Sequence, residues 1–407
     1  MPFILTINAG SSSIKFQCFE VKGEARFDAI NRDSKPLAKG QIDRLNSLNT
    51  SLFYERHDGV TSQTNVPQME YGKIFRLIFQ ILLDPDKGIL RTLNEIQAVG
   101  HRVVHGGSYF AESALVTSEV ETAIQQCVPL APLHNPYNLG GIHACREVLA
   151  DVPHIAVFDT AFHQTMPDYA YMYPIPYHFY EKSGIRRYGF HGTSHRYVSG
   201  RAAEMLERPL AGLKLISCHL GNGCSITAID RGKSIDTSMG FTPLEGLMMG
   251  TRCGDIDPAL IFHLVEEHQM SPGHIHQMLN NESGLLGISG MSSDIRDLLD
   301  APSDKRAMLA LNMFCYRVRR YIGQYAAVLG GLDALIFTAG IGENAPQIRA
   351  KICEKLGFIG INLDEKKNQN VGIEKAIHRA DSPVQVLVIP TNEELMIARD
   401  TFHLIGG

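Results

Sequence analysis

One pattern occurs twice in this sequence, at residues 4–16 and again at residues 216–228. Each copy has an apolar run, a turn of small residues, the dipeptide Ser-Ile and a second apolar run. Such a segment predicts a β-hairpin, and two copies predict two related halves. Because Gly, Ser and Asn dominate the turns, backbone N–H groups and hydroxyls can approach an anion closely there. A Gly/Ser hairpin turn is more often only a turn, so a phosphate-binding role stays one of two alternatives.

Short β-branched runs alternate with longer amphipathic stretches along the rest of the chain, which favours an α/β fold. The runs at residues 4–7, 155–158, 215–217 and 335–337 each lead into small or polar residues. Open α/β sheets bind ligands at such strand ends. With 407 residues the chain is too long for one ordinary core, so two domains of roughly 150–200 residues each are expected.

The net charge of −5, without long Lys/Arg runs, gives no reason to expect binding to nucleic acid or to an anionic membrane. The sequence has no apolar run of 18 residues and no export signal at its N-terminus. Its eight cysteines are scattered without a CxxC pair, which indicates neither a zinc site nor a disulfide framework. Reduced thiols fit a cytoplasmic protein, in which local groups must hold any anionic ligand.

Two nucleotide-binding motifs fail on inspection. The segment 232–234 resembles the end of a P-loop, but Thr227 occupies the position of the first glycine. The segment 340–342 begins like a dinucleotide fingerprint, yet Ala345 stands where the third glycine belongs. Neither a Walker-type nor a fingerprint-type nucleotide site is therefore predicted.

Capping residues predict several element boundaries. Helices are expected at 304–329 and 345–356, with Ser303 and Asn344 as their N-caps. Residues 391–394, Thr-Asn-Glu-Glu, open a last helix in capping-box register, with the threonine as the cap. A strand at residues 384–389 precedes this helix.

Five further segments each place several chemically able residues in few positions: NAGSSSIK at 8–15, HRVVHGG at 101–107, HNP at 134–136, FHGTSH at 190–195, and 242–257 around Arg252. Together with the two glycine loops, Asp159 and Glu393, they resemble the acetokinase family of the acetate and sugar kinase/heat-shock protein 70/actin superfamily. The resemblance covers nearly the whole chain and keeps the order of the motifs in that family.

The resemblance implies an α/β fold of two actin-like (ribonuclease H-like) domains with a central interdomain cleft. The N-terminal domain would cover 1–160 and 390–407. The C-terminal domain would cover 161–389 and carry the nucleotide-binding loops and a dimer interface. The implied reaction is reversible, Mg²⁺-dependent, in-line phosphoryl transfer from ATP to acetate, giving ADP and acetyl phosphate. Mn²⁺ is an alternative metal, and the enzyme would be a cytoplasmic homodimer without nucleic-acid or membrane partners.

The implied acceptor is a carboxylate, which is ionised at pH 7 because such acids titrate near about 4–5. No general base is then required. The reaction needs cations and hydrogen-bond donors that neutralise the crowded negative charge of its transition state. By the resemblance, Arg102 and Arg252 lie at the carboxylate and at the transferring phosphoryl group, where guanidinium forks bond oxygens in pairs.

The resemblance also implies roles for three histidines and an aspartate. His191 would donate to an equatorial phosphoryl oxygen in the transition state; a histidine that only caps a turn is the alternative. Asp159 would order Mg²⁺ waters or the phosphoryl group. His195 is expected either to be structural or to support a residue that contacts the substrate, and His134 is either a phosphate or substrate contact or a core histidine.

Asn8 and Glu393 match the family's Mg²⁺-associated pair, and their oxygen atoms suit a hard cation. The residues implied at ATP are Ser11, Ser12 and Lys15 at the first hairpin, His219, Leu220, Gly221, Asn222 and Gly223 in the second phosphate loop, and Asp294, Ile295, Arg296, Gly340, Ile341, Gly342, Glu343 and Asn344 on the adenosine side.

The positions implied at the methyl group of acetate are Val104, Leu133, Phe190 and Pro243, all apolar. Propionate-preferring relatives carry a smaller residue at the position of Val104, so Val104 favours acetate. Because one methylene is worth only about 1–3 kcal/mol, some use of propionate is expected.

Two alternatives remain from the sequence. The first is a propionate or butyrate kinase on the same scaffold. The second is a non-catalytic, actin-like ATP-binding protein, which the joint presence of Arg102, His191 and Arg252 disfavours because a switch needs only nucleotide contacts.

Overall fold

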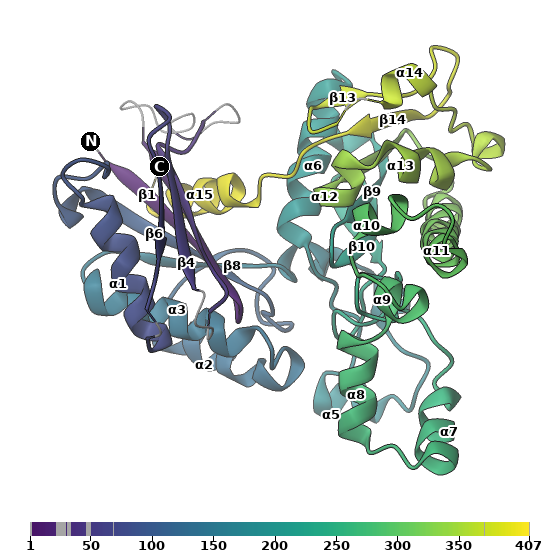
Figure 1. Cartoon of the computed structure of the whole chain (residues 1–407), viewed down its shortest axis with the longest axis horizontal. Helices are drawn as coiled ribbons and strands as arrows, with labels where there is room; N and C mark the ends of the chain where they lie inside the picture. The colour runs from purple at the N-terminus through teal and green to yellow at the C-terminus, as the bar shows by residue number, and fades with distance from the viewer. Residues whose placement is uncertain are drawn as a thin grey trace. The chain divides into compact units, whose positions relative to one another are not determined.

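The structure is a computed structural model that describes residues 2–21, 30, 34–45, 50–67, 69–369 and 371–406. The chain divides into two compact units (Figure 1). Unit 1 comprises Met1–Ala161 and Asn392–Gly407, and unit 2 comprises Phe162–Thr391. The domain boundaries predicted from the sequence are 1–160 with 390–407 for one domain and 161–389 for the other. That these segments fold as separate domains stays a prediction.

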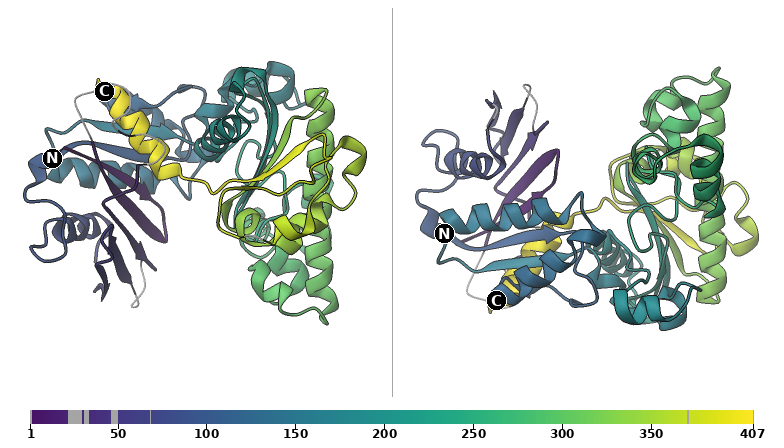
Figure 2. Two further views of the ribbon diagram at one scale, coloured as in Figure 1. Left: turned by 90° about the horizontal axis from the view of Figure 1, so that it is seen from above. Right: turned by 90° about the horizontal axis from the view of Figure 1, so that it is seen from below.

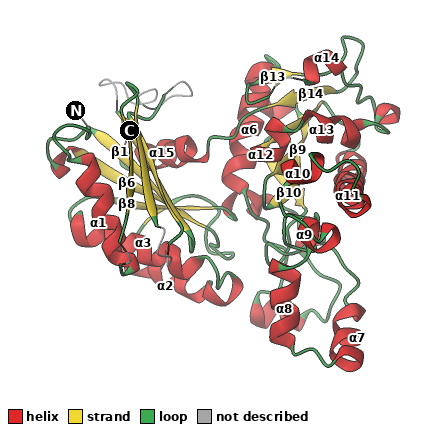
Figure 3. Ribbon diagram, viewed as in Figure 1, coloured by secondary structure: helices red, strands yellow, loops and turns green. Residues whose placement is uncertain are grey.

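Unit 1 contains an eight-stranded sheet in the order β5-β4-β3-β2-β1-β6-β8-β7 within the described residues (Figure 3). Its strands are β1 (Phe3–Ala9), β2 (Ser13–Glu20), β3 (Ala38–Asp43), β4 (Ser51–Arg56), β5 (Thr61–Asn65), β6 (Ile96–Val103), β7 (Ala114–Leu115) and β8 (His154–Phe158). Strand β1 pairs antiparallel with β2 and parallel with β6, and β6 pairs parallel with β8. The carboxyl ends of β1, β6 and β8 therefore lie at the same edge of the sheet.

Helices cover both faces of this sheet. They are α1 (Tyr71–Leu82), α2 (Ser118–Gln126), α3 (Asn135–Val148) and α15 (Glu393–Leu404). A Cβ added at Gly141 of α3 would lie 2.8 Å from the Cβ of Ala9, and one added at Gly100 of β6 would lie 2.2 Å from Oγ1 of Thr401 in α15. Gly100 pairs with Thr6 in the parallel ladder, so both residues face the same side of the sheet. Side chains alternate along a strand, so Ala9, three residues after Thr6, faces the other side. Helices α3 and α15 thus cover opposite faces (Figure 2).

Unit 2 repeats this topology in a six-stranded sheet, in the order β11-β10-β9-β12-β14-β13. Its strands are β9 (Lys214–Leu220), β10 (Cys224–Asp230), β11 (Lys233–Thr237), β12 (Ala334–Thr338), β13 (Lys375–Ala376) and β14 (Gln385–Val388). Strand β9 pairs antiparallel with β10 and parallel with β12, and β12 pairs parallel with β14. The order and directions match those of β3-β2-β1-β6-β8, so the predicted repeat is confirmed.

The helices of unit 2 are α4 (Asp168–Tyr171), α5 (His178–Ser183), α6 (Gly192–Met205), α7 (Ala259–His268), α8 (Pro272–Asn281), α9 (Gly284–Ser289), α10 (Ile295–Leu299), α11 (Lys305–Leu329), α12 (Ala339–Asn344), α13 (Pro346–Cys353) and α14 (Glu365–Asn368). Helix α6 packs its buried Val198 and Ala202 against Leu215 and Ile336 of the sheet. The long α11 contacts β9 and β10 from the other face (Figure 1). The predicted mixed α/β class is confirmed in both units.

Two predicted N-caps are wrong. Asp304, not Ser303, caps α11, because its carboxylate accepts hydrogen bonds from the backbone N–H groups of Arg306 and Ala307 at 2.8 Å each. Asn344 does not cap the next helix but donates its side-chain amide to the carbonyl of Gly340 at 2.9 Å.

The segment 339–353 forms two short helices rather than a loop followed by one helix. Helix α12 ends at Asn344, and α13 begins at Pro346. Between them Ala345 has φ −115° and ψ 80°, because a proline disfavours the helical conformation of the residue before it. The predicted strand 384–389 is present as β14, Gln385–Val388.

The predicted capping box at the start of the last helix is also wrong. The cap is Asn392, whose side-chain oxygen accepts from the backbone N–H of Leu395 at 3.1 Å. Thr391 is used elsewhere: its hydroxyl is hydrogen-bonded to that of Ser194 at 2.8 Å, and its N–H donates to Glu343 at 3.1 Å. Helix α15 therefore begins at Glu393.

Candidate active site

In unit 1, an arginine and an aspartate pair at the carboxyl ends of neighbouring parallel strands. Arg102 of β6 donates from Nε to Oδ1 of Asp159 at 3.0 Å and from Nη2 to Oδ2 at 2.6 Å, and Asp159 directly follows β8. Nη1 of Arg102 also donates to Oδ1 of Asn8 at 3.4 Å. The Asp159 side chain is 2% exposed and that of Arg102 is 21% exposed, so of this pair Arg102 is the more open to a ligand. Burial alone would lower the pKa of Arg102, but the carboxylates of Asp159 and Glu393 outweigh it and raise the pKa.

Glu393 adds a second carboxylate to this group. Its pKa is raised to about 7, mainly by burial; the charges of Asp159 and Glu394 also raise the pKa, and those of Arg102 and Lys15 lower it. A carboxylate that is this costly to ionise is stabilised by an added cation. Asn8, Asp159 and Glu393 supply oxygen atoms only, which suits Mg²⁺ or Mn²⁺.

No cluster of three or more His, Cys, Asp or Glu side chains in the described part of the chain could hold a metal ion. Magnesium ions in phosphoryl-transfer sites are commonly held by one or two carboxylates, several waters and the phosphates of the substrate. The oxygen atoms of Asn8 and Glu393 fit such a partial set of ligands.

The β1–β2 hairpin places the predicted phosphate-contacting residues at an open turn. The N–H of Gly10 donates to the carbonyl of Ser13 at 2.9 Å, which closes the turn. Ser11, Ser12 and Lys15 are exposed, and Lys15 lies opposite Asn8 in the strand pairing. The hairpin thus presents two hydroxyls and an ammonium group next to the candidate metal ligand.

The loop after β6 is held by two buried asparagines of α3. The side chain of Asn138 accepts from the N–H of Val104 at 3.0 Å, and that of Asn135 accepts from His105 at 3.1 Å and donates to its carbonyl at 2.9 Å. Val104 is 6% exposed. Sequence reasoning missed both anchors. The HNP triplet was a signal for one of them, because Asn135 rather than His134 fixes the loop.

Leu133 does not share the burial of the other predicted methyl-pocket residues. It is 52% exposed, whereas Phe190 is 2% exposed and Pro243 is half-buried. Val104 and Leu133 belong to unit 1, and Phe190 and Pro243 belong to unit 2. Their joint role in substrate binding stays a prediction.

In unit 2, His191 occupies a strained position at the start of α6. Its φ is 56°, in the left-handed region that non-glycine residues seldom adopt. Its Nδ1 is hydrogen-bonded to Oγ of Ser225 at 2.9 Å, and its ring stacks on His219 with centroids 4.1 Å apart and planes at 19°. The strain and the contacts hold the imidazole in one orientation at the second predicted phosphate loop.

Arg252 faces the same place as His191. A Cβ added at Gly223 would lie 3.5 Å from Nη1 of Arg252 and 3.6 Å from Nε2 of His191. Nη1 of Arg252 donates to the carbonyl of Pro243 at 3.3 Å. Within the described residues Arg252 has no carboxylate partner, and burial lowers its pKa. A partly buried guanidinium without an anion is costly unless a ligand supplies one.

The turn between β9 and β10 is the counterpart of the first hairpin. The N–H of Gly221 donates to the carbonyl of Gly223 at 3.1 Å, and the N–H of Gly250 donates to the carbonyl of Asn222 at 3.1 Å. A Cβ at Gly250 would lie 2.0 Å from Oδ1 of Asn222, so a larger residue there would displace the Asn222 side chain. Leu220 is fully buried, and Nδ1 of His219 is hydrogen-bonded to Ser194 at 2.8 Å.

A cavity of about 590 Å³ brings together most of the residues predicted on the adenosine side. Its lining residues are Gly221, Asn222, Ser293, Asp294, Ile295, Arg296, Gly340, Ile341, Asn344 and Ala345. Asp294 caps α10 and pairs with the guanidinium of Arg296 at 2.6 Å. Gly342 and Glu343 do not line the cavity: Gly342 is buried against Phe337, and Glu343 accepts from the N–H of Thr391.

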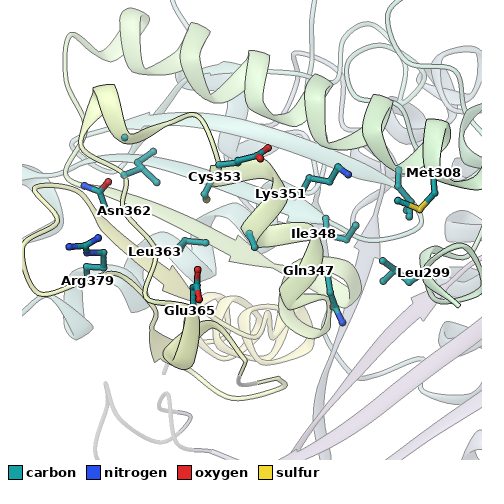
Figure 4. Close-up of a pocket in the computed structure, with 15 residues that line it drawn as sticks. Leu299, Met308, Gln347, Ile348, Lys351, Cys353, Asn362, Leu363, Glu365 and Arg379 are labelled. Atoms are coloured by element: carbon teal, nitrogen blue, oxygen red, sulfur yellow. The ribbon is translucent and has the colours of Figure 1, made fainter. Parts of the chain in front are cut away.

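A second cavity, of about 650 Å³, lies between α10, α11 and α13 and contains none of the predicted site residues (Figure 4). Leu299, Met308 and Ile348 lie at one end of it near Lys351, and Asn362 and Arg379 lie at the other end. It is the larger of the two but lacks the phosphate-facing turns, the arginine and the histidine described above.

Among the described residues, no helix is long and apolar enough to cross a membrane.

The chain is similar over its whole length to proteins of one family. The model of the acetokinase family matches residues 3–399. The acetate kinase of Thermoanaerobacterium thermosaccharolyticum is 54% identical over 405 residues, which cover 99% of this chain and 98% of that protein. The crystal structure of Porphyromonas gingivalis acetate kinase has a TM-score of 0.92 and 43% identity, covering 100% of both chains. A propionate kinase from Francisella tularensis subsp. tularensis has a TM-score of 0.89 and 43% identity, covering 98% of this chain and 99% of that one.

Proposed function

The chain belongs to the acetokinase family, and from this premise we propose that its residues catalyse direct, in-line transfer of the γ-phosphoryl group of Mg-ATP to acetate. As a member of that family it is a kinase that transfers phosphate from ATP to acetate, with ATP and ADP as co-substrates. The reverse reaction forms ATP and acetate from acetyl phosphate and ADP. The proposed residue roles rest mainly on the position of Arg252. Its guanidinium is partly buried, lies beside Gly223 together with the imidazole of His191, and has no carboxylate partner within the described residues.

The chemistry asks for charge neutralisation rather than proton abstraction. An acetate oxygen attacks the γ-phosphorus while the bond to the β–γ bridging oxygen breaks, and the leaving electron pair remains on ADP. Because acetate is already ionised, no residue needs to remove a proton. Arg252 and the Nε2 edge of His191 would bind the equatorial oxygens of the transferring group, where negative charge is concentrated.

In unit 1 we propose that Arg102 binds the carboxylate of acetate through the part of its guanidinium that Asp159 leaves open. The bidentate pair with Asp159 fixes the plane of the guanidinium, so little freedom is lost on binding. Asn8 and Glu393 would hold a Mg²⁺ ion, or Mn²⁺, with water and phosphate oxygens as the other ligands. When bound, the ion would neutralise charge on the β- and γ-phosphates.

For the nucleotide, we propose that the cavity of about 590 Å³ receives the adenosine moiety. The turns at Gly10–Ser13 and at 221–223 would bind phosphates through N–H groups and hydroxyls. Lys15 would add a positive charge at the first of these turns.

Acetate is the proposed acceptor in preference to propionate or butyrate. Val104 is 6% exposed and its N–H is fixed by Asn138, so its side chain cannot move aside easily for a longer acid. The equal identity to an acetate kinase and to a propionate kinase structure makes propionate the alternative substrate to test. A non-catalytic nucleotide-binding protein is the less favoured alternative, since such a protein would not need the side chains of Arg252 and His191 beside the same glycine, Gly223.

We further propose that the enzyme is a cytoplasmic homodimer formed through unit 2. Helix α7 buries none of its residues, although Leu260, Ile261, Phe262 and Val265 are apolar and 37–66% exposed. An apolar helix face of this kind is typical of an interface, and a second copy of the chain is the proposed cover. All eight cysteines are free thiols, which suits a reducing compartment.

The test is the formation of acyl phosphate, trapped with hydroxylamine after a fixed time. The purified chain is incubated with ATP, Mg²⁺ and acetate, propionate or butyrate in parallel. The proposal predicts the highest kcat/KM with acetate and no product when the metal is chelated. An excess of about tenfold in favour of propionate would contradict the acetate assignment, and binding of ATP without any acyl phosphate would support the non-catalytic alternative.

A further inference from the structure

Three side chains form an unbroken line of hydrogen bonds that ends at His191. Oγ of Ser217 lies 2.9 Å from Nδ1 of His195, Nε2 of His195 lies 2.8 Å from Oγ of Ser225, and that oxygen lies 2.9 Å from Nδ1 of His191. Ser217, His195 and Ser225 are all 0% exposed. We call these three residues the buried relay. Water cannot replace any member of the relay easily, so its hydrogen positions are set by the protein.

His195 is electrically neutral in this position. Burial lowers its pKa well below the ordinary value, and the neighbouring His163 and His219 lower it further. A neutral imidazole has one N–H donor and one acceptor nitrogen, and a serine hydroxyl donates one hydrogen. If each hydroxyl donates within the line, the hydrogens of the relay all point toward His191 or all point away from it.

The direction determines what His191 can donate. If the relay points toward His191, then Ser225 donates to Nδ1, and the hydrogen of a neutral His191 must be on Nε2. If the relay points away, Nδ1 of His191 carries a hydrogen, and a neutral ring then offers only a lone pair at Nε2. A phosphoryl oxygen accepts hydrogen bonds, so Nε2 of His191 must carry a hydrogen to bond to it. A neutral ring meets this condition in only one of its two tautomers, whereas a charged ring always meets it.

The surroundings of His191 disfavour a charged ring. Nε2 of His191 and Nη1 of Arg252 lie 3.6 Å and 3.5 Å from the same point beside Gly223, and the ring stacks on His219 at 4.1 Å. A second positive charge beside the guanidinium would be repelled before the substrate arrives. A neutral ring with its hydrogen on Nε2 meets both requirements.

We propose that Ser225, oriented by His195, is a positioning residue that holds His191 as the neutral tautomer with its hydrogen on Nε2, the atom that donates to the transferring phosphoryl group. The inference rests on the proposed function for the role of His191. Neither Ser225 nor His195 touches the substrate in this scheme; both act through the orientation and tautomer of His191.

The first test is direct and independent of activity. The ¹⁵N chemical shifts of the His191 ring, assigned by comparison with His191→Ala, report which nitrogen carries the hydrogen. The full-length wild-type chain is expected to show Nε2–H. Ser225→Ala is expected to raise the fraction with the hydrogen on Nδ1, and Ser217→Ala, which removes the outer link only, to raise it less. An unchanged tautomer in Ser225→Ala would overturn the proposal.

The second test uses kinetics with a matched control. Thr227 lies two residues along β10 from Ser225, is also fully buried, and bonds to Thr237 at 2.9 Å rather than to a histidine. Ser225→Ala is expected to lower kcat about 10- to 100-fold with little change in either KM, by analogy with the loss of a partner that orients a metal-bound histidine. Thr227→Val is expected to keep the wild-type kcat.

The two failures can be told apart. If His191→Ala keeps the wild-type kcat, the proposed role of His191 is wrong, whatever the tautomer. If His191→Ala lowers kcat, the effect of Ser225→Ala is measured both in wild type and in the His191→Ala variant. An equal fold-decrease in kcat in the two backgrounds would show that Ser225 does not act through His191, and the inference would be wrong. Should Ser225→Ala not fold, the same comparison with Ser217→Ala decides, with a smaller expected effect.

Discussion

Replacing Gly223 by alanine tests whether Arg252 and His191 act on one group. The added methyl carbon would lie 3.5 Å from Nη1 of Arg252 and 3.6 Å from Nε2 of His191, which are ordinary van der Waals distances. Gly223 is not among the glycines with positive φ, so alanine fits its backbone. Such a change stabilises a protein by about 0.4–1 kcal/mol or leaves it unaffected, and the thermal midpoint is therefore expected to be unchanged or slightly raised.

Activity is expected to respond quite differently. A phosphoryl oxygen bonded to both groups would lie about 2.7–2.9 Å from each nitrogen, on the side that the methyl group fills. Losing a hydrogen bond to a charged group costs about 1.5–3 kcal/mol. That cost corresponds to a fall in kcat of about 10- to 150-fold for each bond lost.

The assay is the initial rate of ADP formation at saturating ATP and acetate, combined with thermal unfolding of the same preparation. Gly200→Ala is the matched control, because Gly200 lies on α6, the helix that follows His191, and an added Cβ there meets nothing within 4 Å. A Gly223→Ala enzyme with wild-type kcat and an unchanged thermal midpoint would refute the assignment of Arg252 and His191 to one phosphoryl group.

Three further predictions concern the substrate, the carboxylate and the oligomer. Val104→Ala is expected to raise the ratio of kcat/KM for propionate to that for acetate about tenfold, because one methylene is worth about 1–3 kcal/mol; an unchanged ratio would show that Val104 does not limit acid size. The pKa of Glu393 in the folded chain is about 7, above its ordinary value of 4.5. Between these values the folded chain binds this proton more tightly than the unfolded chain, so the free energy of unfolding falls as the pH rises through that interval. In metal-free protein, unfolding scans at about pH 5 and about pH 8 should show a larger fall in thermal midpoint for wild type than for Glu393→Gln, and equal falls would contradict the shift. Phe262→Asp, at a site 66% exposed on α7, is expected to give a monomer by light scattering, whereas Phe358→Asp, at a site 82% exposed, should leave the mass unchanged; a dimer in both variants would exclude α7 from the interface.

The parts of the fold that depend on local sequence could be predicted. The two hairpins, the strands that lead into small residues and the α/β class follow from short apolar runs and turn-forming residues, and all are present. Helix starts were predicted less well because several polar residues compete for each cap. Thr391 fits a capping box on paper, but its hydroxyl and its N–H are bonded to Ser194 and Glu343, which are far from it in sequence.

The same limit applies to the candidate site. Spacing and residue type pointed to Arg252, His191 and the glycine turns, and the cavity beside Asp294 and Gly340 unites segments that the sequence separates. No local signal marked Ser225 or Asn138, because each acts through a partner that the fold brings from another element. The roles assigned to these side chains remain proposals for experiment.

The most direct measurement of the central claim is acyl phosphate formation by Arg252→Ala compared with Arg201→Ala. Arg201 is a matched control, since its side chain is 18% exposed and its guanidinium is paired with the carboxylate of Glu374. By analogy with arginine fingers, Arg252→Ala is expected to lose about 10³-fold or more in kcat, while Arg201→Ala stays near wild type. Equal rates for the two variants would mean that the guanidinium of Arg252 does not neutralise the transferring group.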